Sequence, residues 1–251
     1  MLIFTILDES VRVAWADLCY FKKNFLVVVI SCLIGPLLYL LAFGYGLGSG
    51  MSGGSGNYIA FIIPGIVSLT TLSSSFGSTS SKILIQRLFY MSFDELVLCP
   101  IHVSSIVIGK ALMGTLRSVL SCMIILIIGM IISPAVSITP LVILFIIISS
   151  FTFALLGVLA GMLAKSNQAL NLFNSVVIIP MTFLCGTLFN VSSLPSIFSY
   201  IIYALPLTHS TECIRSASLG WDVPYASIAI MLIYCAVFFI ADYHLIKKGS
   251  S

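Results

Sequence analysis

The chain has 251 residues, of which 60% are hydrophobic and only 8% are charged, and its mean hydropathy is +1.19. This composition excludes a soluble globular protein. The formal net charge of +3 comes from cations at the ends of apolar segments, so it indicates membrane topology and predicts no nucleic-acid partner.

Six apolar stretches are long enough to cross a bilayer, which takes roughly 20 residues each. We predict spans at about 24–48, 58–81, 106–132, 141–163, 169–189 and 223–246. The fold class that follows is an all-α polytopic membrane protein, with one transmembrane permease domain over 1–251.

Ten of the eleven Lys and Arg residues fall at alternate ends of these stretches, and the loops 46–57 and 133–140 carry no charge. The ten are Arg12, Lys22, Lys23, Lys82, Arg87, Lys110, Arg117, Lys165, Lys247 and Lys248. Cytoplasmic loops retain Lys and Arg, so we expect both termini in the cytoplasm and a multi-pass protein of the plasma (cell inner) membrane. Asp8 and Glu9 near the start argue against a secretory signal.

Residues 10–23 precede the first span and read as an amphipathic interfacial helix. Val11, Trp15 and Leu18 share one face, and Lys22 and Lys23 at the end suit the helix dipole. The alternative is a plain cytoplasmic tail.

Small residues within the spans predict close helix packing. The first span contains Gly44 and Gly48 near its outer end, and the fourth contains the pair Gly157-x-x-x-Gly161. The second span has a Pro64-Gly65 pair, which suggests a kink, and its lower half, SLTTLSSSFGSTSS, is rich in hydroxyl groups for a lipid-facing helix.

The sizeable charged loop, at 82–105, contains a short segment, SFDELVLCP, that reads as a helix. We expect Ser92 to cap it, Asp94 and Glu95 to occupy its first turn, and Pro100 to follow its end. A short, acid-tipped cytoplasmic helix has the shape of a docking element. The alternative is a featureless loop.

The segment 190–222 is too apolar for a solvated connector, yet Pro195 and Pro206 cut it to half-length pieces. Half-length helices fit a re-entrant outer segment covered by protein, and Gly220 marks a helix stop.

Three polar residues, His209, Glu212 and Arg215, lie three positions apart and share one face of this re-entrant segment. We expect a Glu212–Arg215 salt bridge that pins the helix, with direct substrate contact as the alternative.

No catalytic or metal-ligating set emerges from the sequence. The glycine run after the first span lacks the Lys-Ser/Thr of a P-loop, and the seven cysteines lie mostly in apolar runs, which predicts neither disulfides nor a metal site. An intramembrane serine protease would have to join Ser49 to His209 or His244, and Ser49 and His244 are expected on opposite membrane faces. His209 is expected on the same side as Ser49, so the protease stays open as a lesser alternative.

Arg117 is the ionisable residue that stands out inside a span, and no Asp/Glu/His relay accompanies it. That pattern argues against a proton- or ion-coupled secondary carrier, which stays open as the alternative. It indicates that another subunit supplies the energy.

Five segments resemble type-2 ABC-transporter permeases, and most closely the membrane subunits of nodulation lipo-oligosaccharide exporters and similar polysaccharide or drug exporters. They are GPLLYLLAFGYGLG (35–48), YIAFIIPGIVSLT (58–70), SSIVIGKALMGTLRS (104–118), IPMTFLCGTLFNVSSLP (179–195) and LPLTHSTECIRSASLG (205–220). The chain departs from that pattern at Gly35 and Lys110, where relatives often carry an acid.

The resemblance implies six transmembrane helices per subunit, a homodimer, and two copies of a separate ABC ATPase, which would hold the ATP and Mg, with no cofactor on this chain. It also implies that 94–99 is a coupling helix in a groove of the ATPase and that 190–220 forms an outer lid. The implied activity is outward export of an amphiphile, whether glycolipid, lipo-oligosaccharide, polysaccharide or drug.

For such a coupling helix we expect Phe93, Leu96 and Val97 as apolar anchors in the partner. Asp94 and Glu95 would meet basic groups there, and Pro100 would set the angle to the third span.

Overall fold

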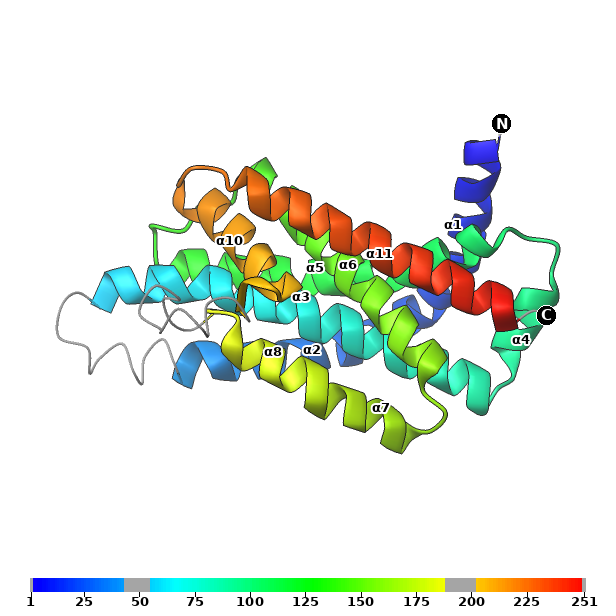
Figure 1. The fold of residues 1–251 in the computed structure, drawn as a ribbon. Helices are drawn as coiled ribbons and strands as arrows, with labels where there is room; N and C mark the ends of the chain where they lie inside the picture. Colours follow the sequence, from blue (N-terminus) through cyan, green and yellow to red (C-terminus); the bar gives the residue numbers. More distant parts are fainter. Residues whose placement is uncertain (1, 43–54, 188–201, 250–251) are drawn as a thin grey trace.

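The computed structural model describes residues 2–42, 55–187 and 202–249. In these residues the chain is helical throughout, and most of its long helices run side by side (Figure 1), which confirms the predicted all-helical class. The elements are α1 (Leu2–Lys23), α2 (Phe25–Tyr39), α3 (Ser55–Leu88), α4 (Ser92–Leu98), α5 (Val103–Ile132), α6 (Pro140–Leu163), α7 (Asn167–Phe173), the π-helical turn η2 (Asn174–Ile178), α8 (Ile179–Leu184), α10 (Pro206–Leu219) and α11 (Tyr225–Gly249).

Five helical segments of the described chain are long and apolar enough to cross a membrane: 25–42, 59–88, 103–132, 140–163 and 225–248. The fifth expected span, at 169–189, is not one regular helix. It is divided into α7, η2 and α8, and Pro180 is the second residue after the π turn. Proline lacks the amide hydrogen that a regular helix needs, and the π turn lies in the residues just before it.

Two sequence boundaries need correction. The N-terminal helix begins at Leu2, eight positions before the expected start at 10, and packs along α5. The expected loop at 82–105 is mostly helical, because α3 continues to Leu88 and carries Lys82 and Arg87 with it. The sequence places a loop there because these cations interrupt the apolar run.

Helix α3 is the centre of the bundle. Its membrane-length window is 83% buried, whereas those of α2 and α11 are 17% buried. It packs against α5, α6 and α10. This explains the hydroxyl-rich sequence that is unexpected for a lipid-facing helix: α3 faces protein, and its hydroxyls find partners there.

The α3 hydroxyls bond partly to their own helix and partly to neighbouring helices. Thr70 donates to the Ile66 carbonyl, and Ser68 donates to Ser210 of α10 at 3.2 Å. Ser210 in turn donates to Ser149 of α6 at 2.8 Å. Hydroxyls in an apolar setting need such partners, so this chain of contacts ties three helices together.

Glycines allow α6 to lie close to α3. A Cβ added at Gly157 would lie 3.0 Å from the Phe76 carbonyl oxygen, and one at Gly161 would lie 2.9 Å from that of Ser80. Any larger side chain would push the two helices apart. Gly44 and Gly48 lie outside the described residues, as does 188–201, which includes most of the expected outer segment before α10.

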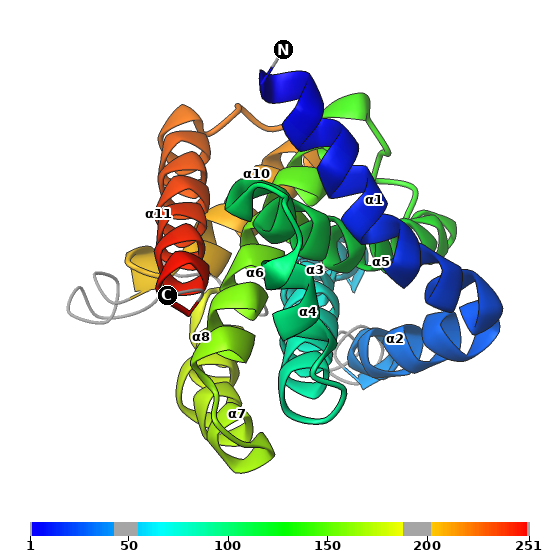
Figure 2. The ribbon, with the colours of Figure 1, turned by 90° about the vertical axis from the view of Figure 1, so that its right-hand side faces the viewer.

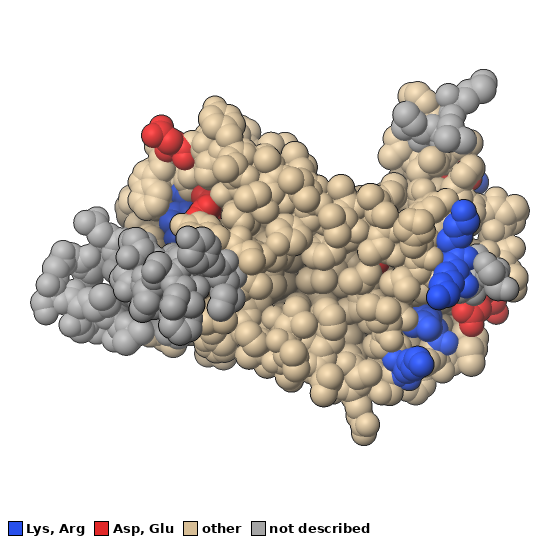
Figure 3. Space-filling model, in the orientation of Figure 1, with Lys and Arg blue, Asp and Glu red and all other residues tan. Residues whose placement is uncertain are grey.

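The two ends of the bundle differ in charge. Lys and Arg side chains gather at the end that carries α4 and both termini (Figures 1 and 3). We call this the basic end, defined by Arg87, Lys165, Lys247 and Lys248. The opposite end, which we call the α10 end, is closed by α10 and the turn between α5 and α6. There the Ser137 backbone N–H donates to the Ser218 carbonyl at 3.0 Å.

Candidate functional site

Helix α4 projects at the basic end, between α3 and α5 (Figure 2). Met91, in the left-handed conformation at φ 54°, precedes the helix in place of the expected Ser92 cap, and Ser92 is the first helical residue. Asp94 and Glu95 lie in the first turn, and Pro100 follows the last helical residue by two positions. Residues before proline favour extended backbone, as Cys99 does here.

Phe93 does not serve as an anchor for a partner. It is 3% exposed and packs in a cluster with Ile83 of α3, Ile106 of α5 and Ile246 of α11. Leu96 and Val97 are half-buried against the same cluster. The apolar spacing that suggested an outward docking face is the face that fixes α4 to its own bundle.

The exposed surface of α4 carries different residues from those expected. Asp94 and Glu95 are exposed, and Leu98 is 86% exposed. Phe89 and Tyr90, in the turn just before the helix, are also exposed. An exposed group of apolar and aromatic side chains beside carboxylates is typical of a protein interaction site.

Next to α4, a cavity of about 950 Å³ lies between α1, α2, α3 and α5. Asp17 of α1 lines it and bridges two cations: its carboxylate lies 3.0 Å from Lys82 Nζ of α3 and 3.4 Å from Lys110 Nζ of α5. Asp17 and Lys110 are both buried. Lys110 and Gly35, the two positions that depart from the family pattern, both line this cavity.

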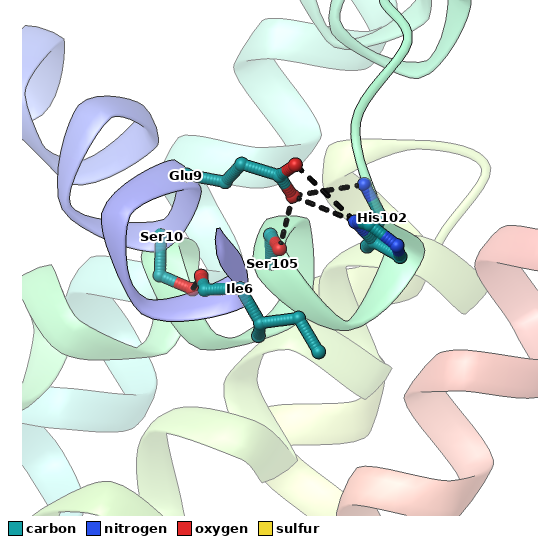
Figure 4. A network of polar contacts seen from close by, with 5 residues as sticks. All are labelled: Ile6, Glu9, Ser10, His102 and Ser105. Atoms are coloured by element: carbon teal, nitrogen blue, oxygen red, sulfur yellow. Dashed lines mark hydrogen bonds and ion pairs between the residues drawn. The ribbon is translucent and has the colours of Figure 1, made fainter. Parts of the chain in front are cut away.

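A second polar contact joins α1 to the start of α5 (Figure 4). The Glu9 carboxylate accepts a hydrogen bond from the Ser105 hydroxyl at 2.6 Å and one from the His102 backbone N–H at 3.0 Å, and it lies 3.1 Å from His102 Nδ1. The Ser105 bond, followed by the His102 backbone bond, lowers the pKa of Glu9 below its ordinary value of 4.5. Together with the Asp17 bridge, this contact fixes α1 to α5.

At the α10 end, Arg215 is enclosed by neutral groups. Its Nη2 donates to the carbonyl oxygens of Gly186 and Thr187 at 3.3 and 3.1 Å, and its Cζ lies 3.7 Å from the centre of the Phe61 ring. Gly65 of α3 allows the Thr187 backbone to approach this closely, because an added Cβ at Gly65 would collide with the Thr187 carbonyl.

The expected Glu212–Arg215 salt bridge is wrong. Glu212 instead accepts a hydrogen bond from the Ser227 hydroxyl of α11 at 2.6 Å, and His209 Nδ1 also lies 3.1 Å from that hydroxyl. The side chains of Glu212 and Arg215 start from neighbouring positions but turn to different helices. Two carbonyl oxygens after α8 accept hydrogen bonds from Arg215 Nη2 in place of the carboxylate, and the buried Nε has no partner among the described residues.

Arg117 is not alone among ionisable groups inside the long helices. Lys110 of α5 and Asp242 of α11 are also buried there, and no described residue bonds to the Asp242 carboxylate oxygens. The signal missed in the sequence is the polar face of the N-terminal helix: Asp17 lies opposite Val11 and Trp15 and supplies the partner of Lys110. Ser49, considered as a protease nucleophile, lies outside the described residues.

The fold and these contacts define a class: a polytopic helical membrane protein with one basic end that carries the short, partly exposed helix α4. Residues 11–219 match the ABC-2 type transporter family. The inner membrane transport permease YadH of Escherichia coli K12 is 23% identical over 245 residues, 96% of this chain and 95% of that protein. Nodulation protein J of Rhizobium meliloti is 27% identical over 216 residues, 85% of this chain and 82% of that protein. Nodulation protein J of Bradyrhizobium diazoefficiens is 27% identical over 239 residues, 90% and 91% of the two chains.

The chain belongs to the ABC-2 type transporter family. It is the membrane permease of an ABC transporter, a transport subunit that is not itself catalytic. The resemblance inferred from the sequence motifs is thereby confirmed. Membership of this family implies an ABC ATPase as the partner.

Proposed function

We propose that this chain is the membrane subunit of an ABC exporter of the inner membrane, driven through α4 by a separate ATPase. Two copies of the chain and two of the ATPase would form the transporter, with the basic end in the cytoplasm. The cations gathered at the end that carries both termini support this orientation.

The observation that carries the proposal is that α4 has one buried face and one exposed face. Phe93 fixes the helix to α3, α5 and α11, and Leu98, Asp94 and Glu95 are left exposed. A helix held rigidly on one face and exposed on the other can transmit a push from a partner to three spanning helices at once. Closure of the ATPase dimer on ATP would then rock these helices.

The substrate we propose is an amphiphile moved outward, of the glycolipid, lipo-oligosaccharide, polysaccharide or drug type. The resemblance of the motifs to nodulation lipo-oligosaccharide exporters supports an oligosaccharide with an apolar part, and nodulation protein J is among the relatives. The cavity also supports an amphiphile, because serine hydroxyls and apolar side chains line it together.

The test is co-purification of an ABC ATPase with the tagged full-length chain, followed by ATP hydrolysis and transport in reconstituted membranes. Leu98→Asp should abolish association, because burying an aspartate in an apolar interface removes a central contact worth about 2 kcal/mol or more. Trp221→Asp is the matched control: Trp221 is also exposed, but it follows α10 at the opposite end, so this variant should bind the ATPase as wild type does.

If Leu98→Asp still binds the ATPase and transports at the wild-type rate, the coupling assignment is wrong. Transport without any ATPase would favour an ion-coupled carrier instead.

A further inference from the structure

The cavity at the basic end carries more positive than negative charge. Lys82, Lys110 and Arg117 line it, and Asp17 is the one carboxylate among its described lining residues. Three cations against one anion leave a charge of +2.

Three lining side chains hold buried polar atoms with no partner among the described residues. They are Thr79 Oγ1, Gln86 Oε1 and Arg117 Nε. Thr79 is 4% exposed, so water reaches its hydroxyl poorly. Buried donors and acceptors without partners are costly. The three atoms are themselves closed off from the cavity, so a ligand would bond to them only after their side chains turn toward the space that the three residues line.

The lining of the cavity is chemically mixed. Helix α3 contributes the hydroxyls of Ser73, Ser74 and Ser78, and Phe21, Val28 and Pro36 of α1 and α2 add apolar surface. The volume of about 950 Å³ lies within the range of small-molecule sites. A ligand that matches this lining has a polar, hydroxyl-bonding part and an apolar part.

We propose that this cavity binds the anionic headgroup of an amphiphile, a phosphate, sulfate or carboxylate, with Arg117 as its main charged donor and Thr79 as a neutral one. Lys82 and Lys110, which share the Asp17 carboxylate, add positive electrostatic potential to the cavity. Arg117 is better placed than the lysines to bind the anion, because no carboxylate of the described chain pairs with it, whereas both lysines contact Asp17. The guanidinium also suits two-point binding of phosphate or carboxylate.

Such a headgroup could belong to the transported amphiphile or to a membrane phospholipid. Its assignment as substrate rests on the proposed export function, whereas the binding site itself does not. The experiment therefore has one arm without ATPase and one arm with it.

The first arm measures lipid retention by native mass spectrometry of the full-length chain. The protein is taken from micelles that hold phosphatidylglycerol and phosphatidylcholine with identical acyl chains in equal amounts. Wild type should retain phosphatidylglycerol preferentially, and Arg117→Gln should reduce that preference about tenfold, since one charge-assisted hydrogen bond is lost. Arg117→Lys should keep most of it.

The matched control is Lys165→Gln, which removes an exposed cation from the same end but not from the cavity. It should retain the wild-type preference. If Arg117→Gln is not recovered from membranes, Lys82→Gln serves as the second variant, because Asp17 keeps Lys110 as its partner; a smaller loss of preference is expected. Equal retention of both lipids by wild type, or equal loss in the cavity variants and Lys165→Gln, would overturn the proposal.

The second arm measures ATP hydrolysis by the complex in phosphatidylcholine vesicles with and without phosphatidylglycerol. Stimulation that Arg117→Gln abolishes assigns the site to the transported amphiphile. Selective binding without stimulation assigns it to a resident lipid, and the anionic site still stands. Selective binding by a chain that recruits no ATPase would contradict the proposed function alone.

Discussion

At the basic end, Lys82 and Lys110 share the Asp17 carboxylate beside a cavity, and Arg117 brings a third cation to the same space. At the α10 end, Arg215 is held by two carbonyls and an aromatic ring in close packing, with Glu212 turned to α11. The first arrangement leaves positive charge available to a ligand. The second holds its cation among neutral groups in close packing, although the Nε of Arg215 has no partner among the described residues. A cation within the bundle can thus mark a binding site or a structural joint, and the cavity beside Arg117 distinguishes the two.

The largest effect should come from removing the anion at the basic end. Asp17→Asn leaves buried Lys110 without its carboxylate, and an unpaired buried charge costs about 3–5 kcal/mol. Adding Lys110→Met should recover much of this loss. Asp8→Asn is the control, because the Asp8–Arg12 pair of the same helix is exposed and contributes below about 1 kcal/mol. Thermal unfolding of the purified variants measures this, and equal losses in Asp17→Asn and Asp8→Asn would contradict the bridge.

At the α10 end, Gly65→Ala should destabilise through overpacking. The new methyl group would collide with the Thr187 carbonyl and approach Arg215, with an expected cost of about 1–3 kcal/mol. Gly77→Ala on the same helix meets nothing within 4 Å, so it should be neutral or slightly stabilising. The thermal unfolding midpoints of the two variants measure this difference. Equal midpoints would show that Gly65 is not closely packed against Thr187.

Arg215→Met tests whether neutral acceptors alone hold the cation. The Gly186 and Thr187 carbonyls lose their donor, which costs roughly 1–2 kcal/mol. Glu212→Gln should cost less, because the amide oxygen can still accept from Ser227. Exchanging the two charges, Glu212→Arg with Arg215→Glu, should not restore stability. Recovery of stability in that double variant would indicate a Glu212–Arg215 salt bridge and would contradict the contacts described here.

The smallest effect concerns pH and the attachment of α1. Since the folded-state pKa of Glu9 is depressed, its contribution is fully present above the unfolded-state pKa and is lost as pH falls through the folded value. The α1–α5 contact should therefore weaken below about pH 4.5. Trp15 fluorescence in a Trp221→Phe background reports this contact, and Glu9→Gln should remove that acid transition. An unchanged transition in Glu9→Gln would assign it to another group.

The long apolar helices could be predicted from the sequence, because an apolar run such as 140–163 is stable only in a membrane or in a protein core. The division of the fifth span could not be predicted, because a proline alone does not break a helix: α2 and α3 contain Pro36 and Pro64. Only the backbone geometry shows the π turn before it.

The candidate sites, too, were predictable from the sequence only in part. The position of α4 could be read from local signals, namely two early acids and a following proline. Which of its faces is exposed could not, because Phe93 is buried in a cluster that draws residues from α3, α5, α6 and α11, far apart along the chain. The Asp17–Lys110 contact has the same character: both residues are visible in the sequence, but only the packing of α1 on α5 makes them partners.

The central claim is that the basic end, with α4 and the cavity, faces the cytoplasm, where an ATPase can reach it. Side-specific labelling of single cysteines in an otherwise cysteine-free chain tests this directly, using Gln168→Cys at the basic end and Asp222→Cys after α10, both at exposed positions. In intact cells, an impermeant maleimide should label Asp222→Cys and should reach Gln168→Cys only after permeabilisation. Labelling of Gln168→Cys in intact cells, with Asp222→Cys protected, would reverse the orientation and contradict the coupling role of α4.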